Sequence, residues 1–167
     1  MMNSREASML TLFILSDLPD EVTAEEAQSI VLASGEVEPM TVRIGIEELE
    51  AAGLVRTRDG FLTVTQAGQE TASSMADKKK LCRAAIHRAM REYKRLTCGI
   101  DYRLSMENGD GGTFLRFSVY VGDKRYFDTS LFFAKASEAL AVYNRMDEDP
   151  ERFYKGFLTV ATGEDLL

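Results

Sequence analysis

Three arginines in the first 60 residues have the chemistry to contact a nucleic acid. Arg43 lies in a segment with helical spacing, and Arg56 and Arg58 come just before an Asp-Gly turn. A guanidinium can pair with O6 and N7 of guanine through two hydrogen bonds, or it can donate to phosphate. Glu47, on the same helical face as Arg43, would accept from cytosine or repel phosphate. The candidate DNA contacts are Thr41, Arg43, Ile44, Glu47, Arg56 and Arg58.

The charge distribution opposes this chemistry. The 167 residues carry a net charge of -7. Residues 1–75 hold 4 basic and 13 acidic side chains, a net charge of -9, whereas residues 76–98 hold 8 and 2, a net charge of +6. DNA affinity rests largely on contacts of Lys and Arg with phosphate. The part with the candidate contacts is therefore the most acidic part, and a protein-binding role stays open beside DNA binding.

A basic stripe follows the acidic part of the chain, on one face of an expected helix. It consists of Lys80, Arg83, His87, Arg91 and Lys94, with Arg88 and Arg95 beside them. Three interpretations are open for this stripe. It extends a DNA-contacting surface, it neutralises the acidic residues of the same chain or of a partner, or it is a solvated helix face.

No motif for catalysis or metal binding is found. His87 is the only histidine, and Cys82 and Cys98 have no paired-cysteine spacing, so we interpret them as reduced thiols of a cytoplasmic protein. The segment "NGDGG" lacks the lysine and the helix that follow in a phosphate-binding loop. The sequence therefore predicts a protein that is not an enzyme, with no catalytic residue, cofactor or metal.

Three helices and a hairpin are expected in the first 70 residues. The first helix begins near Asn3 and ends before Pro19, the second begins at Thr23, and the third is capped by Thr41 and covers residues 42–52. "LVRTR" and "FLTVT" flank Asp59-Gly60, which is the strongest short hairpin signal. Gly45 lies in the middle of the third helix, where it costs roughly 1 kcal/mol relative to alanine, which suggests a close approach to another element.

This order resembles the winged helix-turn-helix of bacterial transcriptional regulators. The resemblance is carried by "EELEAAGLVRTRDGFLTVTQAGQE". This segment contains a leucine expected in the core, a glycine where the third helix ends, and the hairpin. It implies a DNA-binding domain in which the third helix enters the major groove and the hairpin forms a two-stranded wing.

The rest of the chain changes from helical to strand periodicity. Residues 65–96 predict one long connecting helix, in which an apolar seam recurs in heptad-like steps. Alternating apolar residues over 100–133 then predict a three-stranded antiparallel sheet, and two helices follow, the second capped by Asp149 with Pro150 behind it. The second of these helices is expected to bury Phe153, Phe157 and Val160. The predicted fold class is α+β, with domains at 1–70, 71–98 (the connecting helix) and 99–167.

Over nearly its full length the chain resembles an uncharacterised bacterial family, domain of unknown function 4364. The terminal "DPERFYKGF" helix is part of this resemblance. The resemblance implies a regulator-like protein and carries over no catalytic residue.

The expected partners follow from these interpretations. They are double-stranded DNA, a second copy of the chain, and a small-molecule effector or a protein bound by the C-terminal domain. The alternative is a winged helix that binds protein and no DNA. No apolar run reaches the roughly 18 residues needed to span a membrane, so no membrane partner is expected.

Overall fold

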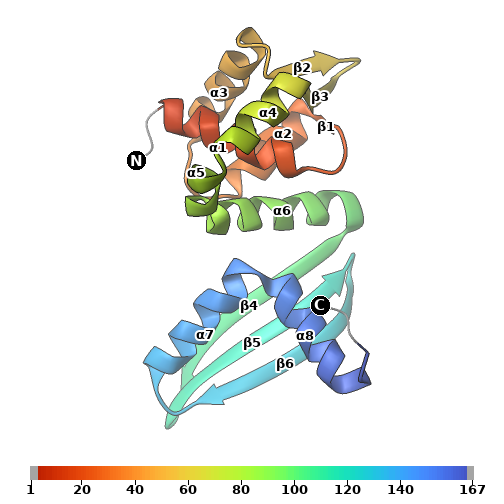
Figure 1. Cartoon of the computed structure of the whole chain (residues 1–167). Helices are drawn as coiled ribbons and strands as arrows, with labels where there is room; N and C mark the ends of the chain where they lie inside the picture. Colours follow the sequence, from red (N-terminus) through yellow and green to blue (C-terminus); the bar gives the residue numbers. More distant parts are fainter. Residues whose placement is uncertain (1–3, 165–167) are drawn as a thin grey trace. The chain divides into compact units, whose positions relative to one another are not determined.

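The computed structural model describes residues 4–164, and within them the fold is α+β. These residues form eight helices and two antiparallel sheets of three strands each (Figure 1). The chain divides into two compact units, Met1–Leu96 and Thr97–Leu167, and each is considered by itself.

The first unit is built around helix α1 (Ser4–Asp17). Every residue from Leu10 to Leu15 is buried. A helical segment that is buried in succession must be covered on all sides, and α2, α3, α4 and the hairpin contact α1. The expected cap at Asn3 lies outside the described residues.

Helix α2 (Ala24–Leu32) begins with the predicted capping box. The Thr23 hydroxyl accepts a hydrogen bond from the Glu26 amide at 3.2 Å, and the Thr23 amide donates to the Glu26 carboxylate at 2.8 Å. The bonds from Thr23 lower the pKa of Glu26, because they stabilise its charged form.

Helix α3 (Pro39–Ala51) begins earlier than predicted. Its cap is Glu38, with Pro39 in the first helical position, so the expected cap at Thr41 is wrong. Proline has no amide hydrogen to lose and its φ suits a helix start, so it marks the true first turn. Thr41 lies inside the helix.

A small sheet completes the core of the first unit. Strands β1 (Val22–Thr23), β2 (Val55–Arg58) and β3 (Phe61–Val64) lie in the order β1-β3-β2. Asp59 and Gly60 connect β2 to β3 with φ values of 53° and 87°. Two positive φ values define a type I′ turn, so the predicted hairpin is confirmed. The two-residue β1 was not predicted, because it is too short to show alternation.

The single long helix predicted after the hairpin is wrong. The structure has α4 (Gln66–Ser74), α5 (Ala76–Leu81) and α6 (Arg83–Cys98), with breaks at Met75 and Cys82 (Figure 1). A straight helix over these residues would be about 50 Å long at 1.5 Å per residue. The breaks allow Ala72, Ile86 and Tyr93 to reach one common core.

The second unit has the predicted three-stranded sheet. Strands β4 (Ile100–Gly109), β5 (Gly112–Val121) and β6 (Lys124–Phe133) pair antiparallel in chain order. Helices α7 (Ala136–Glu148) and α8 (Pro150–Thr162) cover one face of this sheet, over a core of Leu115, Phe117, Val119 and Met146 (Figure 1). The Asp149 side chain accepts from the Arg152 amide at 3.1 Å, which confirms the predicted cap.

Two residues of α8 that were expected to be buried are exposed. Val160 is 87% exposed and Phe157 42%. Helix α8 packs through Phe153 onto Phe117, with ring centroids 5.2 Å apart. Its last turn lies beyond these ring contacts, which leaves Val160 in solvent.

Two glycines allow helices of the first unit to approach their neighbours closely. A Cβ on Gly45 would lie 3.3 Å from Cα of Ser8, so α3 lies directly against α1. This close approach explains why a glycine stands in the middle of the helix. A Cβ on Gly68 would lie 2.1 Å from the carbonyl oxygen of Leu54 and 2.6 Å from a Val64 methyl group. Gly68 therefore sets how closely α4 packs on the hairpin.

We expect Gly68→Ala to destabilise the protein by about 1–3 kcal/mol, because its methyl group would overlap backbone that cannot move freely. Helix propensity alone would give a gain of roughly 1 kcal/mol. Gly45→Ala is the matched control, since its contact is milder and its loss should be smaller. Urea denaturation followed by circular dichroism measures both, and a Gly68→Ala variant as stable as the parent would contradict the close packing.

Candidate nucleic-acid interface

The exposed face of α3 carries most of the candidate contacts. Arg43 and Glu47 have side chains that are 70% and 63% exposed, and Ile44 is 43% exposed. Thr41 is only half-buried beside the fully buried Val42. The structure therefore places three of the four α3 candidates together on one exposed surface, with Thr41 at its margin.

Arg43 already has an anionic neighbour on this face. Its Nε donates to the Glu47 carboxylate at 3.3 Å, one helical turn away. An exposed pair of this kind contributes roughly 0.3–0.5 kcal/mol. Arg43 can therefore exchange Glu47 for another acceptor at small cost.

The hairpin presents the other two arginines. Arg56 and Arg58 alternate along β2 and are both exposed. Arg56 Nε donates to the Thr63 hydroxyl at 3.4 Å, and Arg58 Nε lies 3.5 Å from the Asp59 carboxylate. Neither contact buries the guanidinium, so both remain accessible to an anion.

A hydrogen bond joins the hairpin to α3. The Thr57 hydroxyl donates to the Glu50 carboxylate. A second α3 carboxylate, Glu48, accepts from the Ser8 hydroxyl of α1 at 2.6 Å. Both carboxylates are held by hydroxyl groups of the same unit, which fixes their positions and leaves their negative charge uncompensated.

Two basic residues after the hairpin bind the acidic part of the same unit. Arg88, from the predicted basic stripe, donates through Nε to the carbonyl of Ser34 and through Nη2 to Glu36, both at 2.7 Å. Lys79 contacts Asp17 at 2.5 Å. Neutralisation within the chain therefore accounts for Arg88, whereas Arg83 of the same stripe is exposed. Burial, and then the nearby Glu36, raise the pKa of Cys82.

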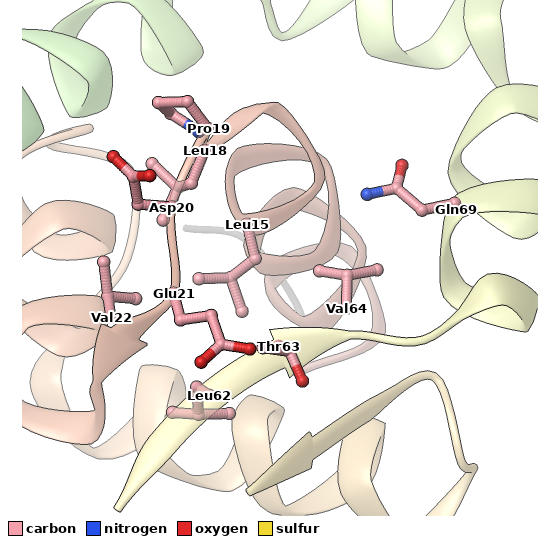
Figure 2. A pocket seen from close by; sticks show the side chains of 10 residues that line it. All are labelled: Leu15, Leu18, Pro19, Asp20, Glu21, Val22, Leu62, Thr63, Val64 and Gln69. Atoms are coloured by element: carbon pink, nitrogen blue, oxygen red, sulfur yellow. The ribbon is translucent and has the colours of Figure 1, made fainter. Parts of the chain in front are cut away.

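A small hollow lies beside the hairpin, between β3, the loop after α1, and α4 (Figure 2). Its volume is about 170 Å³, and its lining includes the carboxylates of Asp20 and Glu21. Asp20 is held by the Tyr93 hydroxyl at 2.7 Å. Two carboxylates make this hollow unsuited to phosphate.

A larger hollow of about 820 Å³ opens between α1, α4, α5 and the end of α3. Its lining is mainly apolar and includes Met9, Leu49, Leu54 and Met75. It offers space for apolar atoms, and the charged residues in its lining are Arg5, Glu6 and Lys78.

The described residues bear on three further features: metal sites, membrane-spanning helices and disulfides. Within residues 4–164, no three His, Cys, Asp or Glu side chains are grouped to hold a metal ion. Among the same residues, every helix is too short or too polar to cross a membrane. Cys82 and Cys98 are both free thiols.

Sequence reasoning missed two exposed apolar residues, one on α3 and one on the hairpin. Met40 is 66% exposed and lies one turn before Ile44 on α3, and Phe61 of the hairpin is 43% exposed. The signal for Met40 was its spacing of four residues from Ile44, which becomes visible once the helix begins at Pro39.

Comparison of the chain with protein-family models, with curated proteins and with solved structures finds no match. A function for this chain must therefore be inferred from its own residues and their geometry.

We expect Arg88→Met to destabilise the first unit by about 1–3 kcal/mol, because the carbonyl of the fully buried Ser34 loses its charged donor. Arg83→Met is the control, since Arg83 lies on the same helix and is exposed. Equal stability of the two variants in thermal unfolding would show that Arg88 contributes no more than a solvated side chain.

Proposed function

We propose that the first unit is a winged helix that binds double-stranded DNA, and that the protein is a transcriptional regulator. One observation carries this proposal: the exposed face of α3, with Arg43, lies in the same unit as a type I′ hairpin that presents Arg56 and Arg58. The bond from Thr57 to Glu50 ties the two elements together. An exposed helix beside an arginine-bearing hairpin fits a groove and the adjacent phosphates.

In this proposal the two elements do different work. Helix α3 enters the major groove, where Arg43 releases Glu47 and donates two hydrogen bonds to guanine. The hairpin lies along the sugar-phosphate chain, where Arg56 and Arg58 contact phosphate. Glu47 then accepts from cytosine if it meets a base, or weakens binding if it meets phosphate.

The acidity of the unit sets the strength of this binding. Residues 1–75 carry a net charge of -9, so few phosphate contacts are available. Non-specific affinity should consequently be weak, and specific binding should depend strongly on each arginine.

A second candidate function is protein binding by the same surface. The exposure of Met40, Ile44 and Phe61 favours it, because apolar side chains contribute to protein interfaces and little to phosphate contact. In this case Arg43 and Glu47 would form the polar rim of the interface.

Three further proposals belong to the same function. The protein acts in the cytoplasm, it works as a homodimer, and its second unit serves assembly or the binding of an effector. DNA half-sites bound by paired winged helices lie about one helical turn apart, which a dimer satisfies.

The arginines should respond differently to substitution. We expect Arg43→Ala to cost roughly 1–3 kcal/mol on a selected DNA site and little on random DNA, because a base contact carries sequence information. Arg56→Ala or Arg58→Ala should weaken both kinds of DNA and reduce the salt slope by about one unit per lost phosphate contact. Fluorescence anisotropy with DNA selected from random fragments measures both effects.

Two controls accompany these variants. Arg83→Met tests a basic residue outside the proposed surface and should leave binding unchanged. Glu47→Gln should strengthen binding to random DNA if that face meets phosphate. If the parent binds no DNA at low salt, or if all three arginine variants bind as the parent does, the protein-binding function takes precedence.

A further inference from the structure

We propose that the outer edge of strand β4 pairs antiparallel with the same edge of a second copy of the chain, joining two three-stranded sheets into one of six strands. Strand β4 has ten residues, and among the described residues it pairs with β5 alone. A long edge strand offers a row of backbone donors and acceptors to another strand. The proposal concerns assembly and does not rest on DNA binding.

The hydrogen-bond pattern of the sheet shows which backbone groups are available. The carbonyl of Gly99 accepts from the amide of Gly122 at 2.9 Å, so this position faces β5. In an antiparallel pair, successive residues face opposite sides. The odd-numbered positions from 101 to 109 therefore face β5, and Tyr102, Leu104, Met106 and Asn108 direct their amides and carbonyls outward.

The charges on β4 select one register. A two-fold axis at Ser105 places Arg103 opposite Glu107 of the partner subunit, and the symmetry forms this pair twice. An axis at Arg103 would oppose two arginines, and an axis at Leu104 would oppose Asp101 and a glutamate. Like charges directly opposite each other destabilise a strand pair.

In the same register nearly all residues of β4 form pairs. With the axis at Ser105, residues 101–109 of both copies pair, and outward residues meet outward residues. This pairing makes about eight backbone hydrogen bonds. An axis at Tyr102 would also oppose unlike charges, but only residues 100–104 could pair, because α6 ends at Cys98.

Side chains on both faces support this pairing. On the open face, Glu107 lies 3.7 Å from Arg116 and Arg103 lies 2.7 Å from Asp101, so each new ion pair would extend an existing one into a network. On the helix-covered face, Leu104 would lie opposite the partner's Met106. Met106 is 42% exposed in the single chain and would become buried.

The other edge of the sheet is less suited to pairing. The pairing of β6 with β5 shifts register between Val119 and Tyr120 of β5, where Tyr126 of β6 has no partner, and such a bulge bends and twists an edge. Its regular part, residues 127–133, contains a single charged residue, Asp128. Within residues 127–133 no register of β6 with itself brings unlike charges together, so the charge pattern favours β4.

A charge exchange tests the register. The parent chain should sediment with twice the mass of 18.7 kDa at micromolar concentration. Arg103→Glu alone, or Glu107→Arg alone, should raise the dimer dissociation constant by roughly tenfold or more, because two attractive pairs become repulsive. The double variant should return to the parent value. Analytical ultracentrifugation at low salt measures all four proteins.

The double variant distinguishes assembly from a local effect. Within one chain it places an introduced glutamate beside Asp101 and an introduced arginine beside Arg116, so contacts inside the chain become worse. Recovery of the dimer can then come only from pairing between copies. A double variant that dissociates like the single variants would overturn the proposal.

A proline tests the edge itself. Met106→Pro removes an outward amide without a loss to the β5 ladder, and it should make the protein monomeric. Ser130→Pro does the same at the outer edge of β6 and should leave the dimer intact. If Met106→Pro does not fold, as judged by circular dichroism, the charge exchange decides alone. A monomeric parent, or a dimer unaffected by every β4 variant, would refute the pairing.

Discussion

The burial of six successive residues of α1 is the constraint on which the first unit depends. Residues 10–15 are buried in succession, and each Leu, Ile or Phe among them contributes about 1.5–3 kcal/mol when removed from water. Such a helix needs neighbours on all sides. Helix α3 approaches it closely at Gly45, and α4 contacts it as well. The bends at Met75 and Cys82 result from this, because one straight helix could not remain against the same core.

Charged side chains determine the surface of this unit. The acidic side chains of residues 1–75 are partly balanced by basic groups from the following helices, as Arg88 and Lys79 show. Residues 1–75 contain only four arginines, all of them exposed, and three of these lie on α3 and on the hairpin. A surface with few cations gains specificity from each of them, because a general attraction to phosphate is weak.

The second unit is built on a three-stranded sheet, and its packing differs from that of the first unit. Its sheet is covered by helices of the same unit on one face (Figure 1), and among the described residues each outer strand pairs with β5 alone. Ion pairs and the contact of Arg103 with the Tyr120 ring, 4.1 Å from its centroid, hold side chains in place on the open face. Ordered charges on an edge strand favour one register over its neighbours, which a flat apolar edge would not do.

The sequence by itself determined the elements that depend on local chemistry. The Asp59-Gly60 turn, the capping box at Thr23 and the Asp149 cap depend on residues within a few positions of one another, and all are present. The sequence also identified α3 and the hairpin as the candidate site. Pro39 is a further local signal, for the first turn of α3, which the prediction of a cap at Thr41 overlooked. Only the tertiary structure decided where the helix after the hairpin breaks, and that Met40 is exposed while Thr41 is not. These features depend on packing against α1 and on contacts between residues far apart in the chain, which no local pattern contains.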